Sequence, residues 1–252
     1  MVLDNFSIDG QIALVTGGTK GIGKAIALAL AEAGADIAVV SRNAHPDIEK
    51  AILDLGRRYT HHAADLTDRE QTRDVVPAVI KKMGDIDILV NNAGIIRRSP
   101  AVEYSEGDWD ATLEIDLTAS FILSQAAGRI MLNKGRGKII NIASMLAFQG
   151  GINIVAYTSA KHGVAGLTKA LANDWAGKGV NVNAIAPGYI VTELTEALQR
   201  DPERSKAITG RIPAGRWGKP EDIARAVLFL VSPASDYIHA VMLPVDGGWM
   251  SW

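Results

Sequence analysis

The stretch that decides the fold is QIALVTGGTKGIGKAIALALAEAG, residues 11–34. It begins with a short apolar run at 11–16, as a buried parallel strand would. A glycine turn follows, and then a helical pattern that Gly34 closes. A strand, a glycine turn and a helix make an anion site, because the helix N-terminus offers free N–H groups and glycines let a pyrophosphate approach the backbone. We therefore expect a dinucleotide to bind here.

The glycine spacing departs from the usual fingerprint. Gly17, Gly21 and Gly23 read G-x-x-x-G-x-G, whereas the dinucleotide fingerprint is G-x-G-x-x-G. For the glycines alone, a tight turn in any α/β protein is the alternative. The loop residues that we expect at the pyrophosphate are Gly17, Thr19, Lys20, Gly21, Ile22 and Gly23.

Strands and helices continue to alternate along the chain, which predicts an α/β fold with a parallel, doubly wound sheet in one domain over 1–252. The segment 189–219 has broken periodicity and is interpreted as a mobile lid or loop over the substrate. We expect further strands within 36–43, 59–66, 86–94, 137–144, 180–188 and 239–248. We expect helices near 68–83, 105–132 and 220–231, and one that contains Tyr157 and runs to about Lys178.

Composition restricts the possible classes of function. The 252 residues suffice for one large domain, and a net charge of −2 gives no basic field for nucleic acid or a membrane surface. The absence of cysteine excludes disulfides and thiolate metal sites and is compatible with a reducing cytosol. Neither a signal peptide nor an apolar run of membrane-spanning length is visible. We expect a cytoplasmic protein without a metal site.

The end of the second expected strand bears on which dinucleotide binds. A cofactor with a free ribose 2′-hydroxyl usually meets Asp or Glu about 20 residues past the glycines. Ser41 and Arg42 stand here instead, and an Arg fork suits a 2′-phosphate. Lys20 adds a second positive charge. Either cation alone could be a solvated surface charge, but together they favour NADP, with NAD left open.

Three residues have the chemistry of a proton relay. Tyr157 and Lys161 are four residues apart, so on a helix they share one face, and an ammonium beside a phenol should lower its pKa from about 10. Ser144, at the end of an expected strand, can offer its hydroxyl to the same substrate oxygen. The three can exchange a proton with an alcohol or a carbonyl, which is useful beside a hydride carrier. The alternative is an amphipathic helix whose Tyr157 packs and whose Lys161 reaches solvent.

The motifs TGGTKGIG, NNAG, Ser144, YTSAK and Pro187-Gly188 occur in the order and spacing of the short-chain dehydrogenase/reductase family, which the whole chain resembles. The resemblance implies a Rossmann-type fold, a nicotinamide cofactor that carries the hydride, and a homotetramer. It implies Tyr157 as acid/base, Lys161 on the nicotinamide ribose and Ser144 on the reacting oxygen. Other residues expected at the cofactor are Asp65, Leu66, Asn92, Ala93, Gly94, Pro187, Gly188, Ile190 and Thr192.

Asp116 departs from the family pattern, which usually has an Asn there to hold a water of the relay. An Asp can also hold water, but its negative charge would perturb the Lys161–Tyr157 pair. We expect an intact relay and count Asp116 with the catalytic residues. The alternative is a nicotinamide-binding sensor that has lost catalysis.

Further stretches, among them NNAGIIRR, NIASMLAFQGG and RIPAGRWG, resemble sugar-acid dehydrogenases of the family. The resemblance implies a hexonate-type sugar acid or polyol that reacts at a secondary alcohol, whose carboxylate needs cations. Each Arg could instead be a solvated charge or a subunit contact, and Trp249 and Trp252 are expected at an interface or over the pocket. A related gluconate oxidoreductase, a 3-oxoacyl-thioester reductase and the larger epimerase branch are alternatives. The candidates for substrate contact are Arg97, Arg98, Gln149, Arg216 and Trp217, with Arg211 nearby.

Overall fold

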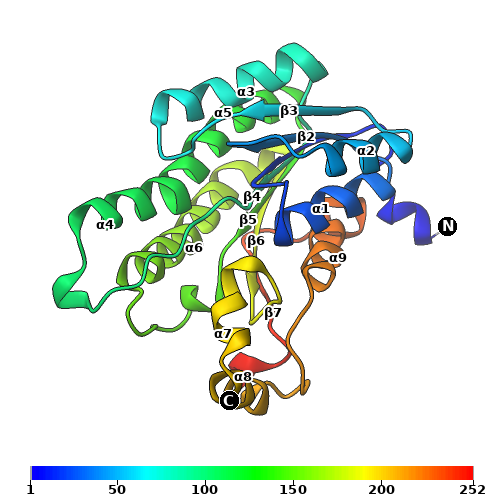
Figure 1. Ribbon diagram of the computed structural model, residues 1–252. Coiled ribbons are helices and arrows are strands. Elements are labelled where there is room, and N and C mark those ends of the chain that lie inside the picture. The colour runs from blue at the N-terminus through cyan, green and yellow to red at the C-terminus, as the bar shows by residue number, and fades with distance from the viewer. Residues whose placement is uncertain (1, 252) are drawn as a thin grey trace.

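A seven-stranded parallel sheet forms the centre of the computed structural model, which describes residues 2–251 (Figure 1). Its strand order is β3-β2-β1-β4-β5-β6-β7. The expected doubly wound, Rossmann-type sheet is therefore confirmed. The strands are β1 (Ile12–Thr16), β2 (Asp36–Ser41), β3 (Tyr59–Ala63), β4 (Ile88–Asn91), β5 (Gly137–Ile142), β6 (Val180–Pro187) and β7 (Met242–Val245).

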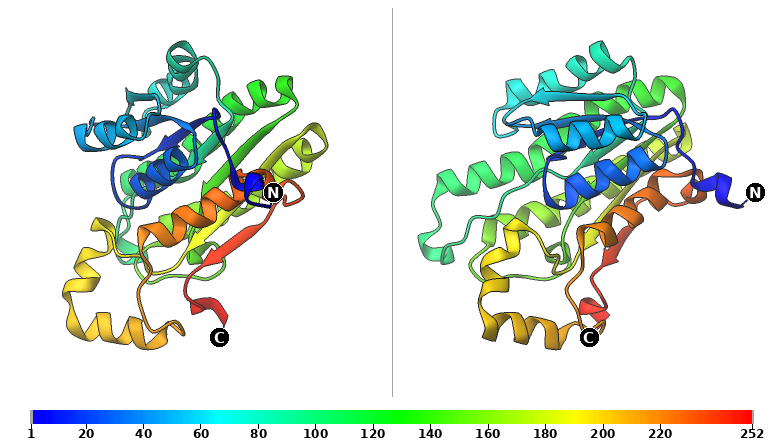
Figure 2. Two further views of the ribbon diagram at one scale, coloured as in Figure 1. Left: turned by 90° about the vertical axis from the view of Figure 1, so that its right-hand side faces the viewer. Right: turned by 45° about the vertical axis from the view of Figure 1, so that its right-hand side comes forward.

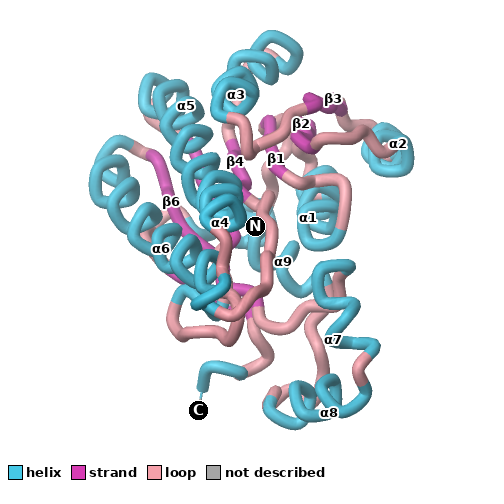
Figure 3. Tube along the Cα trace, turned by 60° about the vertical axis from the view of Figure 1, so that its left-hand side comes forward, coloured by secondary structure: helices cyan, strands magenta, loops and turns pink. Residues whose placement is uncertain are grey.

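Helices cover both faces of the sheet (Figures 2 and 3). Along β1, Ala13 and Val15 pack into the core beneath one helix layer, while Ile12 and Leu14 pack into the core beneath the other. This double burial explains why the strand is apolar throughout rather than alternating. One layer holds α1 (Gly21–Glu32), α2 (Pro46–Asp54) and α9 (Pro220–Val231); the other holds α3 (Arg69–Met83), α4 (Glu106–Leu113), α5 (Ala119–Lys134) and α6 (Val155–Trp175).

The order of the strands positions the site. The chain runs outward from β1 to β3 and then returns to β4 on the other side of β1. Such a reversal opens a crevice at the carboxyl ends of the strands, where open α/β sheets bind ligands. Because every strand pair is parallel, the loops after β1 through β6 all meet at that edge.

Three elements differ from the expectations. The helix α2 was not predicted, although Pro46 opens it and Ile48 and Ile52 bury one side. The helix expected over 105–132 is two helices, α4 and α5, joined by a π-helical turn at Glu114–Thr118.

The segment 189–219 contains two short helices rather than a loop: α7 (Glu196–Arg200) and α8 (Pro202–Arg211). Both project beyond the sheet in Figure 1. Asp201 caps α8 through the Arg204 N–H, yet Ile208 is the one residue of α8 that is buried, so the sequence has no apolar stripe to reveal the helix. Across residues 2–251, no helix is both long and apolar enough to cross a bilayer.

Candidate active site

The glycine loop after β1 leaves no room for side chains. Gly17 and Gly21 have φ angles of +63° and +51°, which favour glycine. A β-carbon on Gly23 would lie 2.3 Å from the Gly17 carbonyl oxygen, so the first turn of α1 packs directly on the loop. The side chain of Lys20, the N-cap residue, gives no hydrogen bond to α1, so the first N–H groups of that helix can bind an anion. This cradle fits a pyrophosphate.

The loops after β1 and β4 are tied together at the crevice. The Thr16 hydroxyl accepts hydrogen bonds from the backbone N–H groups of Asn92 and Ala93, both at 2.9 Å. The Asn92 amide in turn donates to the Thr16 carbonyl oxygen at 2.9 Å. The Asn92 side chain, which we expected at the cofactor, thus holds the glycine turn in place.

At the expected adenosine end, Ser41 is the last residue of β2, and Arg42, which follows it, is exposed. Two hydrogen bonds from Thr67 and, more weakly, the charge of Arg42 lower the pKa of Asp65. Leu66 is buried in the core. Lys20 lies 3.2 Å from Glu193, so the cation expected at the 2′-phosphate is paired with a carboxylate.

The loop after β6 closes the crevice on the other side. Gly188 follows Pro187, the last residue of β6, and a β-carbon there would lie 2.6 Å from the Asp246 backbone. Ile190 is buried, and the Thr192 N–H donates to the Thr195 hydroxyl. A β-carbon on Gly21 would lie 3.5 Å from the Thr192 methyl group, so Thr192 stands directly across from the glycine loop.

Two of the residues with proton-relay chemistry, Tyr157 and Lys161, lie together on α6, and Ser144 precedes the 3₁₀ turn Met145–Ala147. The Lys161 ammonium lies 5.3 Å from the centroid of the Tyr157 ring, one helical turn away, and donates to the Ile142 carbonyl oxygen at 3.1 Å. It also lies 3.3 Å from an Asp116 carboxylate oxygen. The Lys161 and Asp116 side chains are only 5% and 0% exposed, so this is a buried ion pair.

The π-helical turn brings Asp116 to this position. Its other carboxylate oxygen accepts the Ile95 N–H at 2.8 Å. A β-carbon on Gly94 would lie 3.1 Å from both carboxylate oxygens, so the glycine allows the loop after β4 to approach. Asp116 therefore connects that loop to Lys161.

The electrostatics differ from the expectation for Tyr157. Burial raises the pKa of its phenol, and Asp116 raises it further; Lys161, a Ser144 hydrogen bond and Arg98 lower it without cancelling the rise. The predicted net lowering was therefore wrong, although its stated cause is present. Burial alone would lower the pKa of Lys161, but Asp116 and Tyr157 together raise it. Burial raises the pKa of Asp116 against the opposing charge of Lys161.

The structure separates the two neighbouring arginines after β4. Arg97 lies 3.5 Å from Asp108 at the start of α4. Arg98 lies in the segment between two anchored residues. The Ile95 N–H donates to Asp116, and the Ser99 N–H donates to the Asn153 carbonyl oxygen ahead of α6. The positive charge of Arg98 acts on Tyr157. Of the two arginines, Arg98 has a weak electrostatic effect on the Tyr157 phenol, and Arg97 is held to α4.

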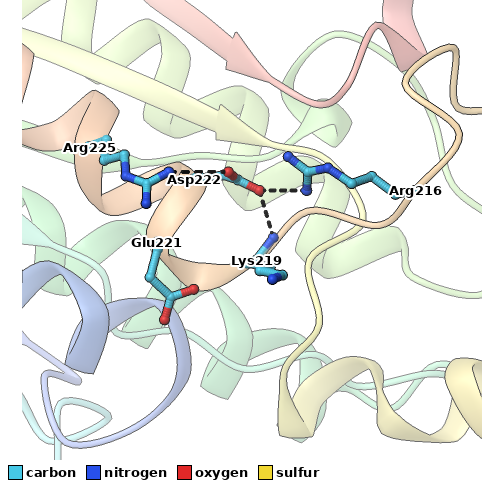
Figure 4. Close-up of a pocket in the computed structure, with 5 residues that line it drawn as sticks. All are labelled: Arg216, Lys219, Glu221, Asp222 and Arg225. Atoms are coloured by element: carbon cyan, nitrogen blue, oxygen red, sulfur yellow. Dashed lines mark hydrogen bonds and ion pairs between the residues drawn. The ribbon is translucent and has the colours of Figure 1, made fainter.

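Arg216 is held at the start of α9 (Figure 4). It donates to Asp222 at 2.8 Å and to the Trp217 carbonyl oxygen at 3.0 Å. These contacts make Arg216 part of the α9 N-terminus. A hollow of about 430 Å³ at this place is lined by Arg216, Lys219, Glu221, Asp222 and Arg225.

Aromatic side chains join the base of α8 to the C-terminal turn. Tyr189 contacts the rings of Trp217 and Trp249 at centroid distances of 5.3 and 4.8 Å. Arg211 lies over the Trp249 ring at 4.0 Å. We call Tyr189, Trp217 and Trp249 the aromatic cluster. Trp249 is buried in it, while Trp252 lies outside the described residues.

Other groups remain to be placed. Gln149 is half-buried after the 3₁₀ turn Met145–Ala147, near Ser144. The Ile95 N–H and His61, beside Ser41, were not singled out from the sequence. The N–H has no side-chain signal. His61 shares a face with Ser41 because β3 pairs with β2 in the register that sets His61 beside Val39, and the sequence does not fix that register. Within residues 2–251, no group of three or more His, Asp or Glu side chains could hold a metal ion.

Comparison with known proteins agrees with this geometry. The family model described as "Enoyl-(Acyl carrier protein) reductase" matches residues 17–250. The 2-dehydro-3-deoxy-D-gluconate 5-dehydrogenase of Bacillus subtilis is 50% identical over 249 residues, which are 98% of each chain. The protein is a short-chain dehydrogenase/reductase.

Other members of the short-chain dehydrogenase/reductase family are as similar. The 2-dehydro-3-deoxy-D-gluconate 5-dehydrogenase of Pseudoalteromonas atlantica is 49% identical over 252 residues, 99% of each chain. A putative 2-deoxy-D-gluconate 3-dehydrogenase from Agrobacterium tumefaciens, solved with bound NADP, is 51% identical with a TM-score of 0.92; the match covers 99% of this chain and 100% of that one. Membership makes this short-chain dehydrogenase/reductase an NAD(P)-dependent oxidoreductase.

Proposed function

We propose that this enzyme interconverts a secondary alcohol and a ketone on a hexonate-type sugar acid, either 2-dehydro-3-deoxy-D-gluconate or 2-deoxy-D-gluconate, with NADP as the cofactor and NAD as a second possibility. The observation that carries the proposal is an exposed arginine, Arg98, whose charge acts on half-buried Tyr157 beside the buried ammonium of Lys161. An arginine can bind the carboxylate of a sugar acid through two hydrogen bonds. The names of the relatives above support the same substrate class.

In the proposed mechanism, a bound nicotinamide would supply or accept the hydride. Tyr157 gives a proton to the substrate oxygen during reduction and takes it back during oxidation. The Ser144 hydroxyl holds the same oxygen. Lys161 lowers the pKa of the phenol, and the Ile142 carbonyl oxygen and Asp116 fix the position of the ammonium.

The raised pKa of Tyr157 gives the two directions different requirements. A protonated phenol at neutral pH is ready to donate to a ketone, whereas oxidation of an alcohol needs the phenolate. We therefore expect the oxidation rate to rise with pH, while the reduction rate stays high at neutral pH. The residues proposed to hold the dinucleotide are the glycine loop, Ser41, Arg42, Asp65, Ala93, Gly94 and 188–192.

The test is absorbance at 340 nm with the purified protein, NADP⁺ or NAD⁺, and a panel of substrates. The panel contains 2-deoxy-D-gluconate, gluconate and other hexonates, neutral polyols and, with the reduced cofactor, a 3-oxoacyl thioester. NADPH formation with a hexonate would support the proposal. Preference for gluconate would favour a gluconate 5-dehydrogenase, turnover of the thioester alone would favour the acyl reductase, and dinucleotide binding without any turnover would favour a sensor.

Substituting Arg98 and Arg97 in turn tests which of the two arginines binds the substrate carboxylate. Arg98→Ala should raise the KM for a hexonate by at least about tenfold, because a charged hydrogen-bonded contact is worth about 1.5–3 kcal/mol. Arg97→Ala, the matched control, should leave KM within about twofold, because its partner Asp108 is an exposed surface group. Initial rates against hexonate concentration measure both, and equal effects of the two substitutions would contradict the role given to Arg98.

Assembly, location and motion belong to the same proposal. We infer a cytoplasmic homotetramer, supported by the exposed apolar side chain of Phe121 on α5; sedimentation equilibrium tests the assembly. We also infer that 189–219 closes over bound substrate. The ion pair between Glu193 of this segment and Lys20 of the glycine loop supports that closure. Hydrogen exchange in 190–211 should slow when cofactor and substrate bind together, and unchanged exchange would argue against a lid.

A further inference from the structure

A serine–histidine pair lies where the second strand ends. The Ser41 hydroxyl donates to the Asn43 carbonyl oxygen at 2.8 Å and lies 3.0 Å from Nε2 of His61 on β3. The same Nε2 lies 3.2 Å from the Ser41 carbonyl oxygen. Ser41 occupies the position at which related folds place the acid for a ribose 2′-hydroxyl. A titratable ring therefore stands directly behind the residue that decides the cofactor.

The charges around this ring are mostly positive. Burial lowers the pKa of His61 most, and the hydrogen bond to the Ser41 carbonyl oxygen opposes it. Adjacent His62, Lys82 of α3 and His45 ahead of α2 each lower that pKa by a smaller amount. The Lys82 ammonium also donates to the His61 carbonyl oxygen at 3.0 Å. On α2, Glu49 acts on Tyr59, which precedes His61 on the same face of β3. Arg42 follows Ser41 directly.

We propose that His61 is a specificity-determining residue for the cofactor: acting through Ser41, its protonated ring strengthens binding of the 2′-phosphate, so that preference for NADP over NAD increases as the pH falls. The inference rests on the dinucleotide site of the proposed function. A phosphate bound beside Arg42 and Ser41 carries up to two negative charges near the ring, and nearby negative charge favours the imidazolium. A free 2′-hydroxyl has no such charge, so NAD gains nothing from the proton.

The sign follows from linkage. Burial, with a smaller effect of the Lys82 charge, holds the pKa of free His61 below its ordinary value of 6.5, so the ring is mostly neutral at pH 7. If NADP raises that pKa, binding takes up a proton, and NADP affinity rises as the pH falls from the bound pKa to the free one. The phosphate titrates near pH 6 as well, but it does so in every variant of the protein.

His62 provides a matched control. It is the neighbouring histidine in the same strand, but its side chain lies 3.8 Å from Asp74 of α3, on the other face of the sheet. Replacing either histidine by Gln removes one titratable ring from β3. Only His61→Gln removes it from the vicinity of Ser41.

The experiment measures the Kd of NADP and of NAD by calorimetry from pH 5.5 to 8 in the wild type, His61→Gln and His62→Gln. In the wild type and His62→Gln, the ratio of the NAD Kd to the NADP Kd should rise about three- to tenfold more on acidification than in His61→Gln, since one pKa unit is worth tenfold. Superimposable profiles for the wild type and His61→Gln would overturn the inference.

A second measurement tests the same inference without the His61→Gln variant, in case that variant folds poorly. The imidazole proton resonances of the wild type and Ser41→Ala are titrated with and without each dinucleotide. NADP, but not NAD, should raise the pKa of His61 in the wild type, and the rise should shrink in Ser41→Ala. An unchanged His61 titration with NADP bound contradicts this inference alone, whereas failure of both dinucleotides to bind would refute the proposed function.

Discussion

At the scale of single residues, Lys161 connects the parts of the site. Its ammonium contacts a main-chain carbonyl oxygen, the Asp116 carboxylate and the face of the Tyr157 ring. A buried charge is tolerated only when it is paired and hydrogen-bonded, and these contacts meet that requirement. The same charge opposes the rise of the Tyr157 pKa that burial imposes. The Lys161 side chain thus holds the site residues together and also opposes the rise in the Tyr157 pKa.

Tyr157→Phe tests the proton step. The ring can still pack beside Lys161, but the hydroxyl is lost, and turnover should fall by at least about 10²- to 10⁴-fold because general acid–base catalysis has that typical value. The Kd of NADP, measured by fluorescence, should change little. Tyr104→Phe is the control, since its hydroxyl contacts the Arg97 carbonyl oxygen instead. Near-normal turnover in Tyr157→Phe would refute the mechanism.

Asp116→Asn tests the charge that departs from the family pattern. The Asn carbonyl can still accept the Ile95 N–H, so the loop should keep its position. Asp116 raises the pKa of Tyr157, so its removal should lower that pKa and move the acid limb of the oxidation rate to lower pH. Turnover at neutral pH should be kept or increased. A kcat–pH profile measures both effects, and a large fall in kcat would show that the carboxylate itself is needed.

At the scale of elements, the glycine loop and α1 form one packed unit. Gly23→Ala should weaken NADP binding at least tenfold and lower stability, because its β-carbon would overlap the Gly17 carbonyl oxygen at 2.3 Å. Gly107→Ala in the first turn of α4 is the control, since an added methyl there meets nothing within 4 Å. That change should keep or slightly raise the melting temperature. Calorimetry gives both quantities, and equal NADP affinities would contradict the tight packing.

The elements also show how far sequence reasoning extends. Apolar strands and glycine turns predicted the sheet because burial on both faces dictates composition directly. The π-helical turn was not predictable, because the apolar pattern of Glu106–Lys134 continues across it and only tertiary contacts of Asp116 select it. The short helices of 189–219 were not predicted because they bury almost no apolar side chains, so the sequence shows no helical apolar pattern there.

The same limit applies to the site. Spacing predicted that Tyr157 and Lys161 meet, because four residues make one turn. It could not distinguish Arg97 from Arg98, since adjacent loop residues have no fixed periodicity and Asp108 decides between them. The pKa of Tyr157 was misjudged because the degree of burial is a property of the folded chain. Contacts between site residues were thus predictable where local helix geometry sets them, but the pKa values of those residues were not.

At the scale of the whole molecule, the amino and carboxyl ends of the parallel strands have different roles. At the amino ends, the Lys134 ammonium lies 2.9 Å from both Asp85 oxygens, 2.8 Å from Asp87 and 2.9 Å from the Ile86 carbonyl oxygen. Asp87 also accepts the Ile12 N–H at 3.0 Å, which ties α5 to the start of β1. This network lies at the end of the strands opposite the crevice, so its role is structural.

Lys134→Met tests that division of tasks. Loss of the ammonium leaves nearly buried Asp87 with only the more distant guanidinium of Arg136, at 3.8 Å, and the free energy of unfolding should fall by about 1–3 kcal/mol. Lys50→Met is the control, because its pair with Asp54 is solvent-exposed and no measurable change is expected. Urea unfolding measures stability, and kcat should stay constant in both. A fall in kcat with unchanged stability would show that the two ends are coupled.

The π-helical turn at Glu114–Thr118 also determines which length changes the gene can accept. Each residue of an α-helix advances the chain by about 100° around the axis, and a π-helical turn contains one residue more than an α-helical turn. Loss of one codon there would replace the π-helical turn by an α-helical turn, so α4 and α5 would keep their relative orientation while the residues within the turn would shift around the axis. Asp116 and Lys161 could then part although neither had been substituted. In an alignment of homologous sequences, a one-residue gap at this turn would therefore indicate a changed active site, just as a substitution of an active-site residue would.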